Sequence, residues 1–176
     1  MKNIIILLNV ITFVFSGCSQ APKKDDFGNK QNPLYGKNTK EIPELKPWNN
    51  YGSIIEAGGK DENGNYRFGI SLFKDKNENI ICVFTEFLEH DEEGIPKKKI
   101  LDAINVGKLE DKENLNYCNC RQNTIFDSEI IAIVIEEDKE IFDKIIKAWR
   151  ANTKTGRIEP IESIKEIDCE NYGYGV

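Results

Sequence analysis

The sequence predicts an α+β fold, in which a mainly antiparallel β-sheet of about five to seven strands carries one amphipathic helix. Two observations predict the sheet: Tyr66–Phe73 alternates apolar and polar side chains, and Glu129–Ile135 is a short β-branched apolar run. A third observation predicts the helix, because apolar residues recur at helical spacing within residues 138–151. A helix packed on one face of an antiparallel sheet is the simplest way to bury both.

The strands are expected in chain order from residue 51 onward. Residues 51–57, "YGSIIEA", can pair with Tyr66–Phe73 across a turn that contains Asn63–Gly64. Residues 79–88, "NIICVFTEFL", are apolar on both faces around Cys82, which is typical of an inner strand. A further strand is expected at residues 99–106.

The helix is expected in "DKEIFDKIIKAWRAN", where Ile141, Phe142, Ile145, Ile146 and Trp149 fall on one helical face. Glutamate and aspartate precede lysine by four residues in two places, the order that stabilises a helix. The turn "TKTG" at residues 153–156 should end the element, and residues 157–169 should return as one or two edge strands.

The N-terminus has the pattern of a secretory signal. Lys2 is followed by the 12-residue apolar run Ile4–Phe15, which is too short to cross a membrane and has the length of a signal-peptide core. The small residues Ser16 and Gly17 and then Cys18 complete the motif "FSGC".

This motif resembles the lipobox of bacterial lipoproteins, in which an apolar residue and two small residues precede a modified cysteine. The resemblance covers about 20 residues and implies cleavage before Cys18 and attachment of acyl chains such as palmitate there. Ser19 stands where an inner-membrane retention signal would place aspartate, so an outer-membrane lipoprotein of the cell envelope is expected. "KKDD" at residues 23–26 is similar to a surface-export signal of Bacteroidota-type lipoproteins, and the choice between periplasm and cell surface stays open.

These features divide the chain into a signal peptide at residues 1–17, a lipidated tether at residues 18–50 and one globular domain at residues 51–176. The tether is polar and contains four prolines, and a flexible coil of its length spans ~30 Å. Removal of the signal leaves 23 basic against 30 acidic residues, a net charge of −7. This excess of acid argues against nucleic acid as a partner, and we expect a monomer.

Four cysteines follow the lipobox: Cys82, Cys118, Cys120 and Cys169. Outside the cytoplasm a disulfide is expected from the "CNC" segment at Cys118 or Cys120 to Cys169, where it would pin the C-terminal strand. Cys82 is expected in the core. The Cys-x-Cys spacing does not match a structural zinc site, and no metal or other cofactor is predicted.

His90 is the only histidine and lies among five carboxylates in "EFLEHDEEG". It motivates one of two functional hypotheses, an envelope hydrolase or metal-dependent enzyme centred on His90 and its neighbours. No catalytic residue is assigned, because the sequence contains no nucleophile motif. A charged loop after a strand is the simpler interpretation.

The preferred hypothesis is a non-catalytic binding module anchored to the envelope. Six basic residues against two acidic ones between Lys139 and Arg157 predict a positive face that binds an acidic protein or a polyanion. The residues expected to bind this partner are Lys144, Lys147, Arg150, Lys154 and Arg157. The tail "NYGYGV" adds two tyrosines that can pack on the sheet or contact a partner.

Overall fold

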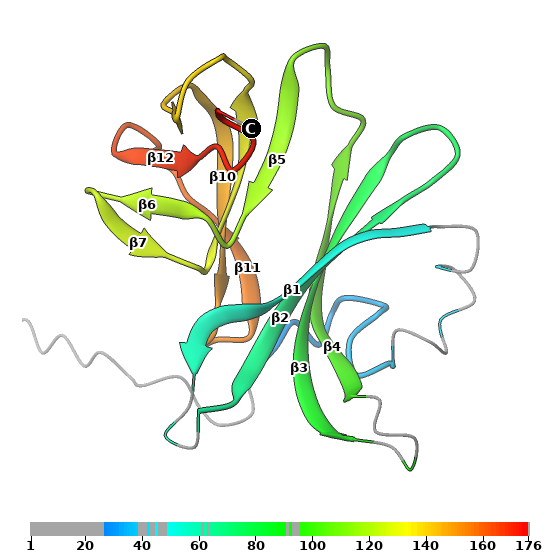
Figure 1. Ribbon diagram of the computed structural model, residues 1–176. Helices are drawn as coiled ribbons and strands as arrows, with labels where there is room; N and C mark the ends of the chain where they lie inside the picture. Colours follow the sequence, from blue (N-terminus) through cyan, green and yellow to red (C-terminus); the bar gives the residue numbers. More distant parts are fainter. Residues whose placement is uncertain are drawn as a thin grey trace, which may run out of the picture.

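Strands account for nearly all of the regular structure in the described part of the chain (Figure 1). The computed structural model describes residues 27–38, 42, 45, 49–60, 62, 64–90, 92 and 96–175. Among these residues there are twelve β-strands and no α-helix, and the strands form three antiparallel sheets of four. The predicted α+β class, with five to seven strands and a helix, is therefore wrong, and the fold is all-β.

Sheet A is an antiparallel meander in the order β1-β2-β3-β4. Its strands are β1 (Asn49–Lys60), β2 (Tyr66–Lys74), β3 (Ile80–His90) and β4 (Pro96–Gly107). All four strands agree with the sequence prediction to within a few residues. Residues Cys82 to Glu86 of β3 are all buried, as expected for an inner strand.

Sheet B has the order β11-β10-β8-β5. Its strands are β5 (Glu113–Tyr117), β8 (Ile130–Ile135), β10 (Ile145–Asn152) and β11 (Arg157–Pro160). The apolar run predicted at residues 129–135 is the inner strand β8, and five of its six residues are buried. The turn predicted at residues 153–156 joins β10 to β11.

Sheet C has the order β7-β6-β12-β9 and much shorter strands. They are β6 (Cys120–Gln122), β7 (Ile125–Asp127), β9 (Ile141–Phe142) and β12 (Ile167–Glu170). Between β6 and β7, Asn123 and Thr124 both have positive φ, as the two central residues of a tight hairpin turn require. The C-terminal residues thus return as two strands, with β11 at an edge and β12 inside its sheet.

The predicted helix at residues 138–151 is instead the two strands β9 and β10. The chain turns between them at Asp143 and Lys144, and the amide of Ile135 on β8 donates a hydrogen bond of 3.0 Å to the carbonyl of Lys144. The isoleucines and Trp149 of this segment favour a pleated sheet as much as a helix. Pairing with β8, which is hydrogen-bonded on both sides, decides between the two structures.

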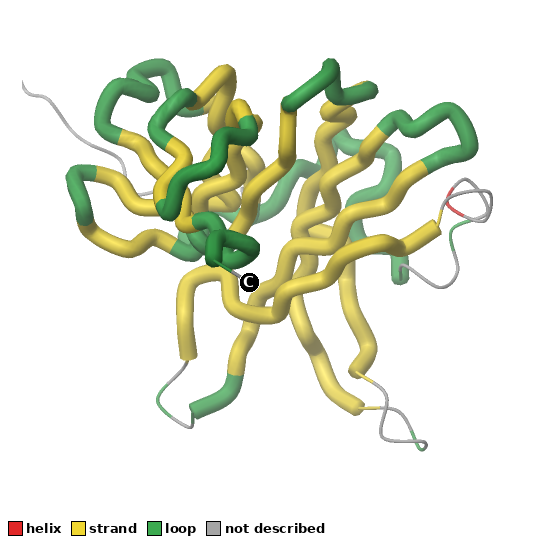
Figure 2. The backbone as a smooth tube through the Cα atoms, turned by 45° about the horizontal axis from the view of Figure 1, so that its top comes forward, coloured by secondary structure: helices red, strands yellow, loops and turns green. Residues whose placement is uncertain are grey.

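Sheet B lies between sheets A and C, and each of its faces is buried against one of them. Core AB, between sheets A and B, includes Phe68, Ile70, Phe84, Ile131, Trp149 and Ile158. Core BC, between sheets B and C, includes Ile130, Ala132, Val134, Ala148, Phe142 and Ile167. Figure 2 shows that long strands form sheet A, whereas short strands and wide loops form the region around sheet C.

Part of the segment expected to be a tether lies against the outer face of sheet A. Ile42 and Leu45 are buried there with Phe73, Val83 and Ile100 of the sheet. The amide of Gly36 donates to the carbonyl of Ile100, and the amide of Ile100 donates to the carbonyl of Lys37.

The carboxylate of Asp102 fastens the same segment to the sheets. It accepts hydrogen bonds from the side-chain amides of Asn29 (3.0 Å) and Asn32 (3.1 Å) and from the backbone amide of Ile158 (2.9 Å). Asp102 is buried, so these donors replace the water that its carboxylate would otherwise need.

Candidate binding site on the outer face of sheet C

The "CNC" segment directs its two cysteines into different cores. Cys118 lies in core AB, and Cys120 lies in core BC. In a regular strand, residues two apart share a face, but Cys118 has φ of 60°, a left-handed conformation that interrupts this alternation between β5 and β6. Of the two cysteines, Cys120 is therefore the one whose side chain lies in core BC, where it can meet Cys169.

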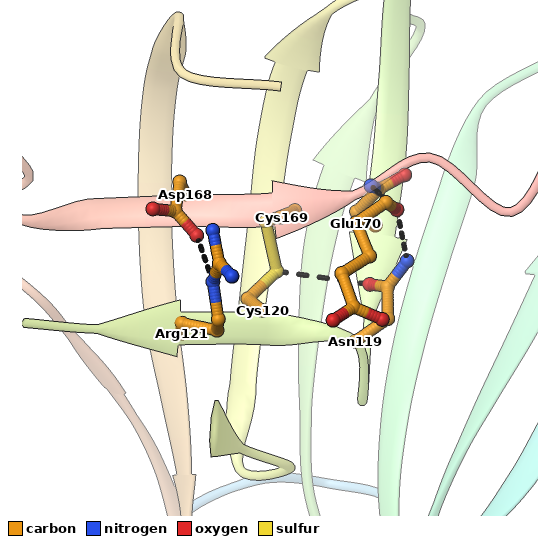
Figure 3. Close-up of a disulfide and its surroundings, with 7 residues drawn as sticks. Asn119, Cys120, Arg121, Asp168, Cys169 and Glu170 are labelled. Carbon is orange, nitrogen blue, oxygen red and sulfur yellow. Dashed lines mark hydrogen bonds and ion pairs between the residues drawn. A yellow bond between two sulfur atoms is a disulfide. The ribbon is translucent and has the colours of Figure 1, made fainter. Parts of the chain in front are cut away.

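Cys120 forms a disulfide with Cys169, the residue directly opposite it in the pairing of β6 with β12 (Figure 3). The predicted bridge from the "CNC" segment to Cys169 is thus present. Cys82 is buried in core AB, as the sequence predicts, and Cys118 is not in a disulfide. The bridge sits between two strands of only three and four residues.

The register of sheet C identifies the residues on its outer face. Cys120 and Cys169 point into core BC, so their neighbours Arg121, Asp168 and Glu170 point away from it. Arg121 lies opposite both Asp168 on β12 and Phe126 on β7. These side chains therefore share the outer face, and Figure 3 shows Arg121 beside Asp168.

A hollow of about 310 Å³, here called the tyrosine hollow, lies over this face between β6, β12 and β9. The residues that line it are Arg121, Glu140, Ile141, Glu170, Asn171, Tyr172 and Tyr174.

Tyr172 and Tyr174 are two of the exposed large hydrophobic side chains of the described residues, with 70% and 48% of their surface accessible. Phe126, on the same sheet face, is 55% exposed. Tyrosine and phenylalanine are enriched where proteins bind partners, because they offer a large contact area and lose little conformational entropy. Aromatic exposure therefore distinguishes this face.

Hydrogen bonds fix the backbone around the tyrosine hollow. Asn171 donates from its side chain to the carbonyl of Lys139 (2.9 Å) and from its amide to the carbonyl of Glu140 (2.8 Å). On the other side, the side chain of Asn119 donates to the carbonyl of Glu170 (2.8 Å, Figure 3). With the disulfide beneath it, the hollow is held in place before any ligand arrives.

The tyrosine hollow has an excess of negative charge. The guanidinium of Arg121 donates to the carboxylate of Asp168 at 2.6 Å, and this hydrogen bond is the main cause of a raised pKa of Arg121. The charges of Glu170 and Glu140 act in the same direction. Since Asp168 already balances Arg121, the carboxylates of Glu140 and Glu170 give the hollow its net charge.

A second hollow of about 300 Å³ lies between the β2–β3 turn and β5. It is lined by Lys74, Glu78, Ile80, Lys108, Leu109, Glu110, Glu113, Asn114 and Glu136. Its volume and its acidic excess are similar, but it has no aromatic side chain. Glu78 forms ion pairs of 3.3 Å with both Lys74 and Lys108. The second hollow therefore provides a matched control for the tyrosine hollow.

The five residues expected to bind an acidic partner lie on β10, the β10–β11 turn and β11 and in the turn that precedes β10. Lys144 contacts the carboxylate of Glu137, and the ammonium of Lys147 lies 4.8 Å from the ring centre of Trp149. Lys154 and Arg157 are exposed. The predicted helix would have placed these residues on one face, but the segment forms strands instead. Their role in binding stays a prediction.

Arg150 is the most enclosed of the five. Its guanidinium donates to Asp127 (2.5 Å), Glu129 (3.4 Å) and the side-chain oxygen of Gln122 (2.9 Å). These partners come from β6, from β7 and from the turn after it, so Arg150 links sheet B to sheet C. Its positive charge is balanced within the protein.

His90 is the exposed last residue of β3. Of the carboxylates near it, Glu89 forms an ion pair with Lys97 (3.0 Å), and Glu86 forms one with Arg67 (2.6 Å). Asp91 and Glu93 lie outside the described residues. In the part of the chain that the structure describes, no cluster of three or more His, Cys, Asp or Glu side chains is arranged to hold a metal ion.

The chain matches no protein-family model, no curated protein and no solved structure. Within the described residues, no helix has the length and apolar character needed to cross a membrane. The predicted signal peptide and the predicted lipidation site at Cys18 lie outside those residues.

Of the residues around the tyrosine hollow, sequence reasoning singled out only the tyrosines of the C-terminal tail. It missed Arg121, Glu140 and Glu170, which carry no motif. Arg121 and Glu170 are 49 positions apart in the sequence, and only the register of β6 with β12 brings them to one face. The cysteines beside them were the one available signal, because a bridge between Cys120 and Cys169 also joins their neighbours.

Proposed function

We propose that the protein is a non-catalytic binding module of the bacterial envelope, anchored by a lipid on Cys18, and that the tyrosine hollow binds a basic segment of a partner protein. The observation that carries this proposal is the combination of two exposed tyrosines with two carboxylates, in a hollow whose lining contains one cation that is already hydrogen-bonded to Asp168. Such a site suits a lysine or arginine side chain.

The chemistry of the hollow supports a cationic ligand in two ways. The face of a tyrosine ring attracts an ammonium or guanidinium group within about 6 Å of its centre, with about 0.5–2 kcal/mol. The carboxylates of Glu140 and Glu170 add charge-assisted hydrogen bonds and accelerate encounter. The disulfide beneath Arg121 and Glu170 reduces the entropy lost on binding, because the site is ordered beforehand.

The anchor fits this role. A lipoprotein signal implies that the domain is displayed at a membrane, where it can capture partners that share the same envelope. Three acyl chains hold a protein far more firmly than one chain, whose binding is marginal.

Calorimetric titration with a short acetylated peptide of lysine, arginine and glycine tests the proposal. The variants Y172A/Y174A and E140Q/E170Q should each weaken binding about tenfold, which corresponds to ~1.4 kcal/mol. The control variant E110Q/E136Q removes the same charge from the second hollow and should leave the dissociation constant unchanged. A peptide that binds wild type and all variants equally, or does not bind wild type, would contradict the proposal.

A further inference from the structure

The amino-terminal segment meets the folded domain at the β10–β11 turn. The amide of Gly28 donates a hydrogen bond of 2.6 Å to the carbonyl of Thr155. Gly156 lies so close that a Cβ on it would come within 2.7 Å of the Gly28 amide nitrogen. The amide of Asn29 then donates to the carbonyl of Leu101 (3.0 Å). The chain therefore joins the domain at one defined place on its surface.

Only residues 19–26 separate this place from the predicted lipidation site. They lie between Cys18 and Phe27 and contain two lysines and two aspartates, so they add no net charge. A chain of this length spans at most ~30 Å when fully extended and about 15–18 Å as a flexible coil. A lipid on Cys18 therefore keeps the β10–β11 end of the domain close to the membrane.

Exposed basic residues surround the same place. Lys154 lies in the β10–β11 turn, Arg157 begins β11, and Lys60 ends β1. All three are exposed. The end of β1 reaches the turn, because a Cβ on Gly58 would lie 2.6 Å from the methyl group of Thr153. Lys60, Lys154 and Arg157 are here called the basic end.

The carboxylates beside the turn are occupied by the turn itself. Glu129 accepts a hydrogen bond from the hydroxyl of Thr153, and Glu159 accepts one of 2.8 Å from the hydroxyl of Thr155. Both glutamates are half-buried, whereas Glu62 is the exposed carboxylate of the described part of the β1–β2 loop. Among these described residues, three exposed cations thus face one exposed carboxylate.

The basic end and the tyrosine hollow lie at opposite ends of β10. The Asn152 end of this strand leads into the β10–β11 turn. Near the Ile145 end, Asn171 of the hollow donates hydrogen bonds to the carbonyls of Lys139 and Glu140. Figure 1 shows the C-terminus beside the upper end of sheet B and the β10–β11 turn at its lower end.

We propose that the basic end rests on anionic lipid headgroups of the membrane that holds the Cys18 lipid, so that the tyrosine hollow points away from this membrane. The proposal rests on the lipid anchor of the proposed function. Lysine and arginine side chains are attracted to an anionic lipid surface only within about one Debye length, ~8–10 Å. The short free chain keeps the basic end near enough for this attraction.

The acidic β3–β4 hairpin bears on which side of the domain meets the headgroups. The pairing of Phe68 with Glu86 places this hairpin at the same end of sheet A as Lys60. However, β3 and β4 lie two and three strands from β1, or ~10–14 Å at the usual strand spacing. Repulsion of the hairpin therefore tilts the domain onto β1 and the β10–β11 turn.

Amine labelling on vesicles tests this orientation. The acylated full-length product is purified from bacterial membranes, its Cys18 lipid is verified by mass spectrometry, and it is inserted from outside into preformed vesicles. The vesicles contain phosphatidylcholine alone or with about one-third phosphatidylglycerol. On anionic vesicles, acetylation of Lys60 and Lys154 should be about threefold slower than on neutral ones, and ~1 M salt should remove the difference.

Lys108, whose side chain is 61% exposed at the opposite end of sheet A, should react equally on both vesicles. The variant R157E should lose most of the protection of Lys60 and Lys154, whereas the control K76E, in the exposed β2–β3 turn, should keep it. An acylated protein whose lysines react equally on both vesicles would overturn this inference and leave the proposed function intact. A product without an acyl group on Cys18 would contradict the anchor and this inference together.

Discussion

Sheets A and C each contain four antiparallel strands, but different interactions stabilise them. The strands of sheet A are 9 to 12 residues long, and both faces of the sheet are covered by apolar residues. The strands of sheet C have two to four residues, and only one face packs on a core. The Cys120–Cys169 disulfide and the ion pairs of Arg121 and Arg150 stabilise sheet C in place of the apolar packing that its short strands lack.

This difference explains why the binding site is assigned to sheet C. Apolar residues pack on both faces of sheet A, whereas the outer face of sheet C exposes Phe126 and borders the tyrosine hollow. A covalent bond can hold such a face in place without an apolar layer over it. The comparison predicts which changes damage the whole fold and which damage only the site.

The largest effect is expected for Phe84→Ala in sheet A. Phe84 is completely buried, and its ring centre lies 5.7 Å from that of Phe68. The cavity left in core AB should lower the free energy of unfolding by about 3–5 kcal/mol, measured by urea denaturation. The control Leu88→Ala, at a side chain 60% exposed, should change it by less than about 0.5 kcal/mol. Similar losses for both variants would show that core AB does not stabilise the fold as described.

The next effect is expected for C120A/C169A, which removes the disulfide of sheet C. The bridge closes a chain segment of 49 residues, so its loss should cost about 3–4 kcal/mol. Amide hydrogen exchange should accelerate in β6 and β12 well before it does in β2 and β3. Uniform acceleration throughout the chain would mean that sheet C does not depend on the disulfide more than sheet A does.

A smaller effect is expected for Arg150→Met, which removes the charged link between sheets B and C. Asp127 and Glu129 then lose this cation but keep their other hydrogen bonds, and because the Arg150 side chain is 26% exposed, water compensates in part. We expect a loss of about 1 kcal/mol, measured by thermal denaturation, with Lys154→Met as the exposed control. A stability equal to that of wild type would assign Arg150 no part in holding sheet C.

The sequence predicted the strands of sheet A, β8 and the return of residues 157–169 as strands, but it missed β5, β6 and β7 and assigned β9 and β10 to a helix. Alternation in Tyr66–Phe73 and the apolar run at residues 129–135 are long enough to show their period, and both are strands. In β7 and β9, two or three residues cannot show any period. The segment from Ile141 to Trp149 matched a helix because the turn at Asp143 and Lys144 shifts the strand pattern into helical spacing.

The candidate site was less predictable, because it depends on register. Composition pointed to Tyr172 and Tyr174, and the cysteine count pointed to a bridge to Cys169. Which cysteine of the "CNC" segment forms the bridge depends on the left-handed backbone conformation at Cys118, which no local pattern indicates. The pairing of Arg121 with Asp168 follows from that bridge and could be read only from the folded chain.

The central claim is that the tyrosine hollow, held by the Cys120–Cys169 disulfide, is the surface that binds a basic segment. Amide chemical-shift mapping by NMR during titration with the lysine- and arginine-containing peptide tests it most directly. The account predicts that the largest shifts fall on Arg121 and on residues 170–174 and that they disappear when the disulfide is reduced. Shifts concentrated on the second hollow, around Glu110 and Glu136, or equal shifts with and without the disulfide, would contradict it.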